Sequence, residues 1–508
     1  MFARKLNRSL WLEPAETRFP SLTDTLDVDV VVIGAGITGV TTAHLLKEAG
    51  KSVALIESSG VGYGASGYTT AKLTVGHNLV YHDLIESLGE DVASGYARSN
   101  QEAIERIEAI VRDNSIDCDL ERASNYVYTE REESVGAVER EAAAARRAGI
   151  DAELTTETDL PYPVRAAVRV DDQAQFHPWK YLAGLARTVD GDGSHVLELT
   201  RATSVRSGTP CEVETASGVI RAAHVVVATQ MPFLDRGLYF TRAHPLKSYA
   251  IATRVDADSA PSGMYISVDQ PTRSIRSTPS DGGGRMLIVG GEGGHKPGDD
   301  PDTKSRYAKL EAFMQERFGV SGAEYHWSTH DYVPVDKLPY IGRLRRGDDR
   351  VYVATGFAKW GLTKGTLAAR VLSDAILGRA NEWAELYDST RVDLRRGATR
   401  FTKENAGVGL RFFRDRVRPR DGRKDVERLA PGEGTIARLG AKQYAVFRND
   451  AGELGVLSAR CTHLGCIVGW NAADRSWECP CHGSRFAEDG TLVQGPATAD
   501  LPRESLPE

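Results

Sequence analysis

A glycine-rich turn near the start of the chain limits the fold more than any other feature of the sequence. The apolar run 30–33 leads directly into Gly34, Gly36 and Gly39, which are spaced as G-x-G-x-x-G. A helical pattern follows, and a second apolar run ends at Glu57. A strand, this glycine spacing, a helix, a second strand and a terminal acid together predict a βαβ unit that binds a dinucleotide.

Each of these residues has a physical role in that prediction. Gly34 permits the tight turn, Gly36 lets the backbone approach a pyrophosphate, and Gly39 lets the helix pack closely on the strand. The N-terminus of the helix offers free N–H groups to the phosphates. Glu57 is suited to accept hydrogen bonds from a ribose, and its charge disfavours the 2′-phosphate of NADP.

Further strand and turn motifs follow the fingerprint in a recognisable order. They are DVVVIGAGITG, ALIE, GASGYTTAK, VVVATQ, VDKLPYIGRL and VATGFAKWGLT, and they span about residues 25–380. This order resembles the D-amino-acid-oxidase-like family of FAD enzymes, which includes glycine, sarcosine and γ-glutamylputrescine oxidases. The resemblance implies that FAD is bound by nine residues: Gly34, Gly36, Gly39 and Glu57 at the ADP half, Ser66 and Thr70 near the pyrophosphate, and Gly356, Gly361 and Leu362 near the isoalloxazine.

A substrate-binding part is expected beside the FAD-binding part. Residues 236–334 contain short runs rich in β-branched and aromatic residues, which predict an antiparallel sheet over the substrate cavity, and 99–148 look helical. A substrate with a carboxylate needs a cation near the flavin, and the candidates are Lys72, Lys247 and Lys359. An ordinary solvated lysine is the alternative for each. Tyr249 and Trp360 could line the pocket or lie in the core.

Two other patterns suggest binding sites that we do not expect to form. The glycine cluster in 287–298 follows an apolar run, but it lacks the third glycine and Pro297 prevents a prompt helix, so we expect no second nucleotide site. His326, His330 and Asp331 suggest a two-histidine, one-carboxylate iron site. Their segment looks extended, and side chains four residues apart do not converge on a strand.

Four cysteines and two histidines crowd into residues 461–482. Cys461 with His463 and Cys479 with His482 form two pairs, C-x-H and C-x-x-H. Such a set can bind zinc or a Rieske [2Fe–2S] cluster. The segments CTHLGC and CPCHGS resemble the two loops of Rieske domains, in which the cysteines hold one iron and the histidines the other. From about residue 425 short strands alternate with turns, which predicts a small all-β domain.

The Rieske resemblance carries further implications. Cys466 and Cys481 stand where cytochrome bc-type members form a disulfide between the loops. Ser484 matches a serine that donates to a bridging sulfide, and residues 495–497 match the proline loop that covers the cluster. Phe486 stands where high-potential members have tyrosine, so we expect a lower reduction potential than theirs.

These assignments give the following layout. The fold class is an α/β FAD-binding Rossmann-like domain with an antiparallel-sheet substrate domain, plus a small all-β Rieske domain. Residues 1–394 form the oxidoreductase, with the FAD part at about 25–98, 160–235 and 335–380 and the substrate part at about 99–159 and 236–334. Residues 395–424 form a basic linker, and 425–508 form the Rieske domain.

Net charge and hydropathy limit the partners and the cellular location that we expect for the protein. The formal net charge of −7 argues against a nucleic-acid partner, and no apolar run is long enough for a membrane span. The first residues do not resemble a secretory signal, so a cytoplasmic location is expected. We expect an FAD-dependent oxidoreductase that oxidises an amine or amino acid and passes electrons through the cluster to an unknown partner. The alternative is a reductase, or a redox-sensing or electron-transfer protein, with electrons entering at the cluster.

Overall fold

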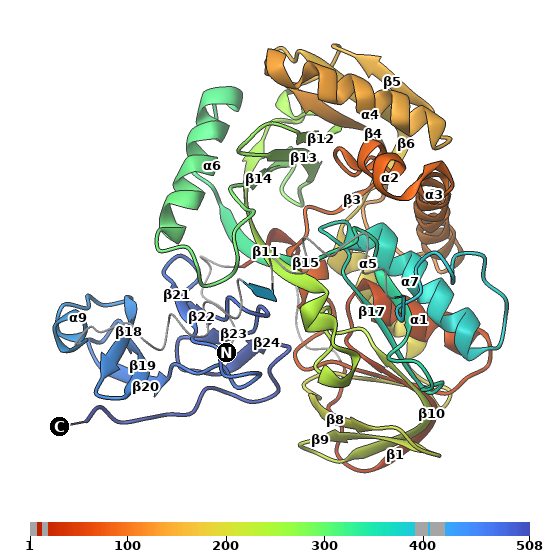
Figure 1. Ribbon diagram of the computed structural model, residues 1–508. Helices are drawn as coiled ribbons and strands as arrows, with labels where there is room; N and C mark the ends of the chain where they lie inside the picture. Colours follow the sequence, from red (N-terminus) through yellow and green to blue (C-terminus); the bar gives the residue numbers. More distant parts are fainter. Residues whose placement is uncertain (1–7, 13–18, 392–404, 407–421, 508) are drawn as a thin grey trace.

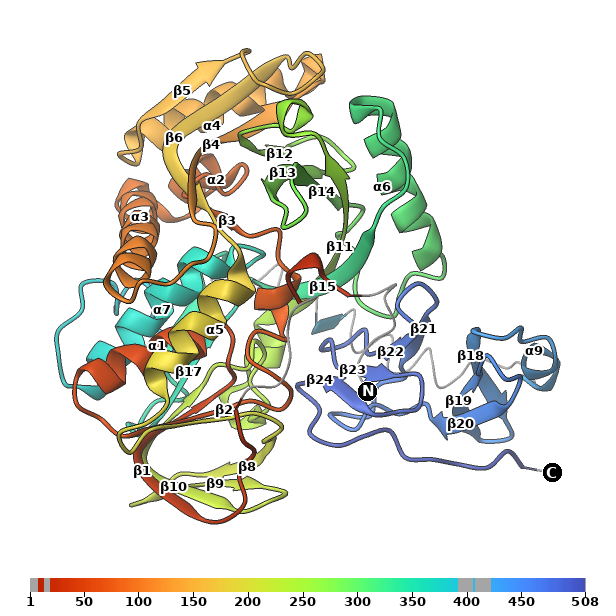
Figure 2. The ribbon, with the colours of Figure 1, turned by 180° about the vertical axis from the view of Figure 1, so that it is seen from behind.

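The computed structural model describes residues 8–12, 19–391, 405–406 and 422–507. Two large sheets and two small ones make up the molecule, and the small sheets lie beside the junction of the large ones (Figure 1). The view from behind shows the same arrangement, with the C-terminal strands set against β11 and β15 (Figure 2). Most of the expected basic linker lies outside the described residues.

The first sheet contains the dinucleotide fingerprint. Its strands run in the order β16 (Tyr340–Arg343), β17 (Val351–Thr355), β10 (Val219–Val227), β1 (Leu26–Ile33), β2 (Val53–Ile56) and β7 (His195–Leu197). All neighbours are parallel except β16 and β17. A hairpin of β8 (Ala202–Arg206) and β9 (Cys211–Thr215) continues from β10.

Alternation along β1 explains how this sheet is covered. Val30 and Val32 face one core, which also contains residues of α1 (Ile37–Glu48), α5 (Pro178–Val189) and α7 (Gly361–Ile376). Val31 and Ile33 face a second core with the β8–β9 hairpin. Both faces are buried, which is why the strand reads as an uninterrupted apolar run.

The second sheet forms the substrate side. Its order is β15 (Tyr325–Pro334), β11 (Ala243–Val255), β14 (Arg285–Gly291), β13 (Arg273–Pro279), β12 (Met264–Ser267), β4 (Glu121–Thr129), β6 (Ala166–Gln175) and β3 (Lys72–Leu73), with β5 (Ala152–Thr155) beside β6. Helix α6 (Thr303–Phe318) packs on β11 and β14. Helices α2 (Val80–Leu88), α3 (Glu90–Asp113) and α4 (Val135–Arg147) belong to the N-terminal half of the chain.

This sheet corrects three expectations. It is mixed rather than antiparallel, because β12 and β4 pair in parallel. The stretch 99–148 is helical in α3 and α4, but β4 lies between them. Strand β6 was assigned to the FAD part and pairs with β3, β4 and β5 of the substrate sheet. Periodicity shows that a strand exists, but its sheet depends on pairings between distant segments.

The C-terminal region is all-β apart from α9 (Arg423–Glu427). One antiparallel sheet contains β18 (Gly434–Leu439), β19 (Lys442–Arg448) and β20 (Leu454–Ser458). The other contains β21 (Gly469–Asn471), β22 (Ser476–Glu478), β23 (Arg485–Ala487) and β24 (Leu492–Gln494).

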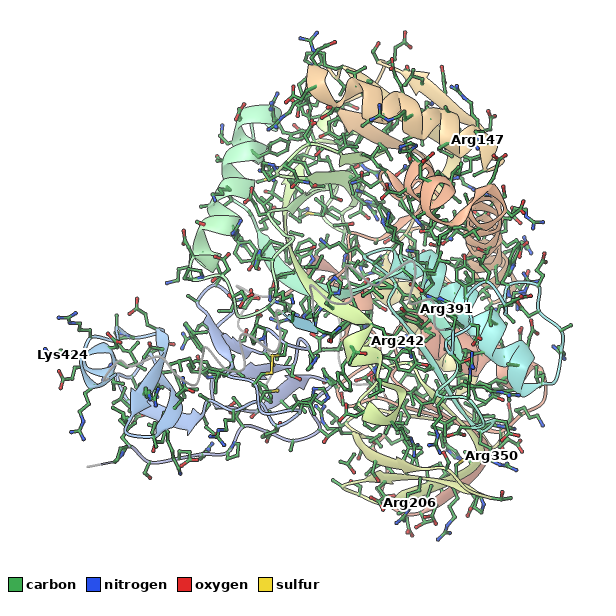
Figure 3. The ribbon with its side chains drawn as sticks, viewed as in Figure 1. Arg147, Arg206, Arg242, Arg350, Arg391 and Lys424 are labelled. Carbon is green, nitrogen blue, oxygen red and sulfur yellow. A yellow bond between two sulfur atoms is a disulfide. The ribbon has the colours of Figure 1, made fainter. Side chains whose placement is uncertain are left out.

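Short 3₁₀ helices complete the description: η2 (Leu10–Leu12), η3 (Ala65–Tyr68), η4 (Glu132–Ser134), η5 (Asp235–Gly237), η6 (Tyr239–Thr241) and η7 (Ala257–Ser259). The η5–η6 turn ends beside Arg242, whose guanidinium lies 4.7 Å from the ring centre of Tyr340 (Figure 3). Arg391 covers the same ring at 4.1 Å.

In the described part of the chain, no helix has the length and hydropathy needed to cross a membrane.

Candidate functional site

A cavity of about 2400 Å³ extends from the glycine fingerprint to the C-terminal domain. Its wall includes Gly34, Gly36 and Glu57 from the fingerprint region and Gln494 and Pro496 from the C-terminal domain. A volume of this size accommodates a large cofactor together with a small substrate.

The turn between β1 and α1 shows why two of the glycines are needed. Gly34 has a φ of +104°, and a Cβ there would stand 2.7 Å from the carbonyl oxygen of Ala228. A Cβ on Gly39 would stand 1.7 Å from the carbonyl oxygen of Gly34. Helix α1 therefore sits directly on the turn, and its first residues, including Ile37, line the cavity.

The predicted ADP-binding acid lies at the end of β2. The Glu57 carboxylate accepts hydrogen bonds from the backbone N–H groups of Ala35 at 2.9 Å and Ser59 at 3.0 Å. The Ser66 hydroxyl accepts from the N–H of Ile37 at 3.0 Å. Ser66 and Thr70 also line the cavity. A helix N-terminus, a fixed carboxylate and glycine-lined space fit the phosphates and ribose of FAD.

The residues predicted at the flavin end separate into two groups. Gly361 and Leu362 line the cavity at the start of α7. Gly356 does not line it. With a φ of +80°, it forms the turn after β17 against the ring of Pro334.

The three candidate lysines have three different environments. Lys72 lines the cavity and donates to the carbonyl of Tyr265 and the hydroxyl of Ser274, and burial lowers the pKa of its amine well below the usual value. Lys359 is exposed and also lines the cavity.

Lys247 does not fit the expected substrate-facing position. Its side chain is fully buried, and it forms ion pairs with Asp474 and Glu478 of the C-terminal domain rather than lining the cavity. A buried cation with two carboxylates is already neutralised, so its environment is structural. Tyr249 and Trp360, by contrast, both line the cavity.

Asp331 and Gln230 are cavity residues that sequence reasoning did not select. The Asp331 carboxylate accepts from the N–H of Lys359 at 2.6 Å and from that of Tyr332 at 2.8 Å, and burial raises its pKa. The side-chain amide of Gln230 donates to Asp331 at 3.3 Å. Asp331 was considered only as an iron ligand. The segment is indeed the strand β15, which separates His326 from His330.

Two loops of the C-terminal domain bring the cysteine and histidine pairs together. The thiols of Cys461 and Cys479 share a hydrogen bond, and the rings of His463 and His482 lie 5.1 Å apart. The Nδ1 atoms of both histidines are buried without a hydrogen-bond partner among the described residues. Two free thiols and two orphaned imidazole nitrogens fit the donor set of a Rieske [2Fe–2S] cluster.

The electrostatics of two of these residues, Cys461 and His482, suit metal binding. Burial lowers the pKa of His482 to about 3, so its imidazole is neutral near pH 7. The hydrogen bond from Cys479 lowers the pKa of Cys461 to about 7, and the hydroxyl of Ser484 contributes in the same direction. Metal ligation requires a neutral imidazole and a thiolate.

A disulfide joins Cys466 to Cys481 and appears as the yellow bond between the two loops (Figure 3). The sulfur atoms of these two cysteines and Cys479 lie within 4.8 Å of one another. Because two of the three are bonded together, only Cys479 has a thiol free to bind metal in this group. The free thiol of Cys461 is hydrogen-bonded to that of Cys479, so these two cysteines fit the predicted ligand pair.

Several contacts connect the cluster site with the FAD-binding side. The hydroxyl of Tyr332 donates to the carbonyl of His482 at 2.7 Å, while the carbonyl of Tyr332 accepts from the N–H of Ala358 at 3.0 Å. The amide of Gln494 donates to that of Gln230. Strand β15 thus contacts both the cavity and a cluster-binding loop.

Comparison with known proteins agrees with this geometry. Residues 29–375 match the family model "FAD dependent oxidoreductase" (DAO), and residues 423–504 match "Rieske [2Fe-2S] domain". YhfW of Bacillus subtilis (strain 168), which is named for a Rieske 2Fe-2S centre, is 34% identical over 99% of both chains.

The larger domain also has relatives without the C-terminal part. Gamma-glutamylputrescine oxidoreductase of Escherichia coli (strain K12) is 26% identical over 72% of this chain and 87% of its own. The crystal structure of glycine oxidase from Geobacillus kaustophilus superposes with a TM-score of 0.60 at 20% identity, covering 72% of this chain and 100% of its own. This structural likeness shows the fold.

Proposed function

The chain belongs to the DAO family of FAD-dependent oxidoreductases and carries a Rieske [2Fe–2S] domain, and from this premise we propose that it oxidises an amine or amino acid and passes the electrons through the cluster to an external acceptor. FAD supplies the two-electron oxidation of a C–H bond, and the cluster supplies one-electron transfer. The residues of the chain supply binding, orientation and electrostatics.

The observation that carries the proposal is the extent of the cavity. One continuous space is lined by the fingerprint, by the start of α7 and by the proline loop at Gly495 and Pro496. The cofactor space and the cover of the cluster site are therefore neighbours, which favours electron transfer within one molecule. A fused one-electron centre also argues that O₂ is not the main acceptor.

We propose these roles for the cofactor-binding residues. The N–H of Gly36 binds the pyrophosphate, Glu57 accepts from the ribose, and the start of α7 at Gly361 and Leu362 approaches the flavin. The cluster is held by Cys461, His463, Cys479 and His482.

An amine-bearing substrate is supported by two observations. One relative acts, by its name, on gamma-glutamylputrescine, and Asp331 offers the cavity a carboxylate that can attract an ammonium group. Lys359 and Lys72 remain the candidates for a substrate carboxylate, since both line the cavity. Lys247 is not proposed again, because its charge is used by Asp474 and Glu478.

Anaerobic reduction tests the proposal. The full-length protein is mixed with a panel of amines and amino acids, and absorbance follows the flavin while EPR follows the cluster. We expect at least one amine to bleach the flavin and then to reduce the cluster. If no amine does so while a reduced ferredoxin reduces first the cluster and then the flavin, electrons enter at the cluster and the reductase alternative holds.

A further inference from the structure

The histidine edge of the cluster site faces the FAD-binding side of the molecule instead of solvent. His463 Nε2 donates to the carboxylate of Asp235 across 2.7 Å. The ring of Phe240 lies 6.0 Å from the ring of His463 and 5.2 Å from that of His482. Only 5% of the His463 side chain is exposed. The rings of both histidines are therefore in contact with residues 235–240.

The turn that carries these residues is also held by contacts with residues other than the histidines. The hydroxyl of Tyr239 donates to the carbonyl of Leu344 at 3.0 Å, and the guanidinium of Arg242 lies 4.4 Å from the Tyr239 ring. A nitrogen of Arg242 also donates to the carbonyl of Gly237 at 3.0 Å. These contacts hold the middle of the η5–η6 turn and its C-terminal end, and thereby limit the movement of Asp235 beside His463.

The two nitrogens of His463 then have separate tasks. Nδ1 is buried without a partner among the described residues and is the atom left for iron. Nε2 carries the proton, because its neighbour is a carboxylate oxygen. A carboxylate that accepts from a metal-bound imidazole fixes its tautomer and ring orientation and makes it a stronger electron donor. A more electron-rich ligand stabilises the oxidised cluster relative to the reduced one.

We propose that Asp235 is a positioning residue of the cluster, supplied by the FAD-binding side, and that it lowers the reduction potential by its hydrogen bond to His463. The reduction potential of the cluster then depends on the contact between the C-terminal domain and the FAD-binding side, as well as on the residues of the C-terminal domain itself. The inference holds for either direction of electron flow and for any substrate, so it is independent of the proposed amine oxidation.

The test is the variant Asp235→Asn in the full-length protein. The amide oxygen can still accept from His463, but the negative charge is gone. We expect the balance between oxidised and reduced cluster to shift roughly tenfold toward the reduced form, which is a rise of about 59 mV for a one-electron couple. The potential is measured by a redox titration followed by EPR, with dithionite as reductant and no substrate.

Two further variants separate the hydrogen bond from a general charge effect. Asp258→Asn removes an exposed carboxylate on η7 and should leave the potential near that of the wild type. Asp235→Glu keeps the charge and should remain closer to the wild type than Asp235→Asn. Iron analysis gives the loaded fraction, and the potential is read on that fraction. A shift in Asp235→Asn no larger than that in Asp258→Asn would overturn the inference.

Discussion

At the scale of single residues, the absence of a hydroxyl at Phe486 is a distinctive feature of the cluster site. The ring is fully buried and lies opposite Trp477 in the β22–β23 pair. No hydroxyl can donate from this position, whereas hydrogen bonds donated to the sulfur atoms of a cluster raise the potential by stabilising the reduced, more negative form.

The variant Phe486→Tyr should therefore raise the cluster potential, by about 59 mV if the new bond changes the equilibrium tenfold. Phe447→Tyr, in the same core on β19, adds a hydroxyl away from the cluster loops and serves as the control. EPR-monitored titration of both variants checks the effect. An unchanged potential in Phe486→Tyr would show that the missing hydroxyl does not set it.

A second residue-scale prediction concerns the fingerprint. Gly39→Ala places a methyl group 1.7 Å from the carbonyl oxygen of Gly34, so α1 must move off the turn that lines the FAD cavity. Overpacking of this kind costs about 1–3 kcal/mol, and we expect loss of bound FAD. Gly136→Ala in α4 meets only the flexible end of Arg140, at 3.4 Å, and should retain FAD. The flavin absorbance of the purified variants measures the difference.

At the scale of elements, the contact between β11 and β22 fixes the C-terminal domain. Lys247 on β11 pairs with Glu478 on β22 and with Asp474 in the preceding turn, and all three side chains are at most 2% exposed. Arg485 pairs with the same two carboxylates. The hydroxyl of Tyr307 on α6 adds a hydrogen bond to Asp474.

Removing the charge of Lys247 should show how much this contact contributes to the free energy of unfolding. Lys247→Met leaves the two buried carboxylates with Arg485 as their remaining ion-pair partner among the described residues, and breaking a buried pair in this way costs about 3–5 kcal/mol. Lys442→Met is the control, because that lysine is 67% exposed and its ion pair with Glu504 contributes at most about 1 kcal/mol. Urea denaturation followed by circular dichroism compares the variants. Equal losses of stability would contradict the role given to Lys247.

The same contact predicts an acid-sensitive component of stability. Burial acts to raise the pKa of Asp474, but the charges of Lys247 and Arg485 outweigh it and hold the pKa at about 2, below the usual value of an aspartate. A depressed folded-state pKa contributes stability above the unfolded value, and that stability is lost as pH falls toward the folded value. The loss amounts to about 2 kcal/mol between pH 4 and 2.

Asp474→Asn should remove this component. Its unfolding free energy is expected to fall less steeply with acid over that range than the unfolding free energy of the wild type. Denaturation curves at several pH values check the slope. If the unfolding free energy of both proteins fell equally steeply with pH, the acid sensitivity would come from groups other than Asp474.

The contrast between local and distant contacts explains what the sequence could predict. The fingerprint glycines, the cluster ligands and the Cys466–Cys481 positions lie within short segments whose spacing carries the chemistry. Lys247 and Asp474 are 227 positions apart, and Asp235 and His463 are 228 apart. Nothing in local periodicity relates such pairs, so the lysine was assigned to the substrate and the aspartate was not selected. The pairing of β6 with β4 was missed for the same reason.

At the scale of the whole molecule, the packing of the C-terminal domain against the FAD-binding side covers the cluster site differently on two sides. Its histidine edge is closed by Asp235 and Phe240, and its proline loop borders the cofactor cavity. While the domains are docked, an external carrier cannot meet the histidines directly and must approach another part of the cluster-binding domain. Reduction and reoxidation of the cluster would then use different sides of one small domain.

We proposed that the cluster is the route from flavin to carrier, and removal of one cluster ligand tests that route. Cys461→Ala should abolish the cluster EPR signal while FAD remains bound, because Cys461 lies outside the fingerprint and the cavity wall. A reducing amine, or light-driven reduction, should still bleach the flavin, but transfer to a one-electron protein acceptor such as cytochrome c should be lost. Cys118→Ala removes a buried free thiol remote from the ligand loops and should preserve that transfer. Undiminished cytochrome c reduction by Cys461→Ala would mean that the flavin reaches its acceptor without the cluster, and the fused domain would then need another explanation.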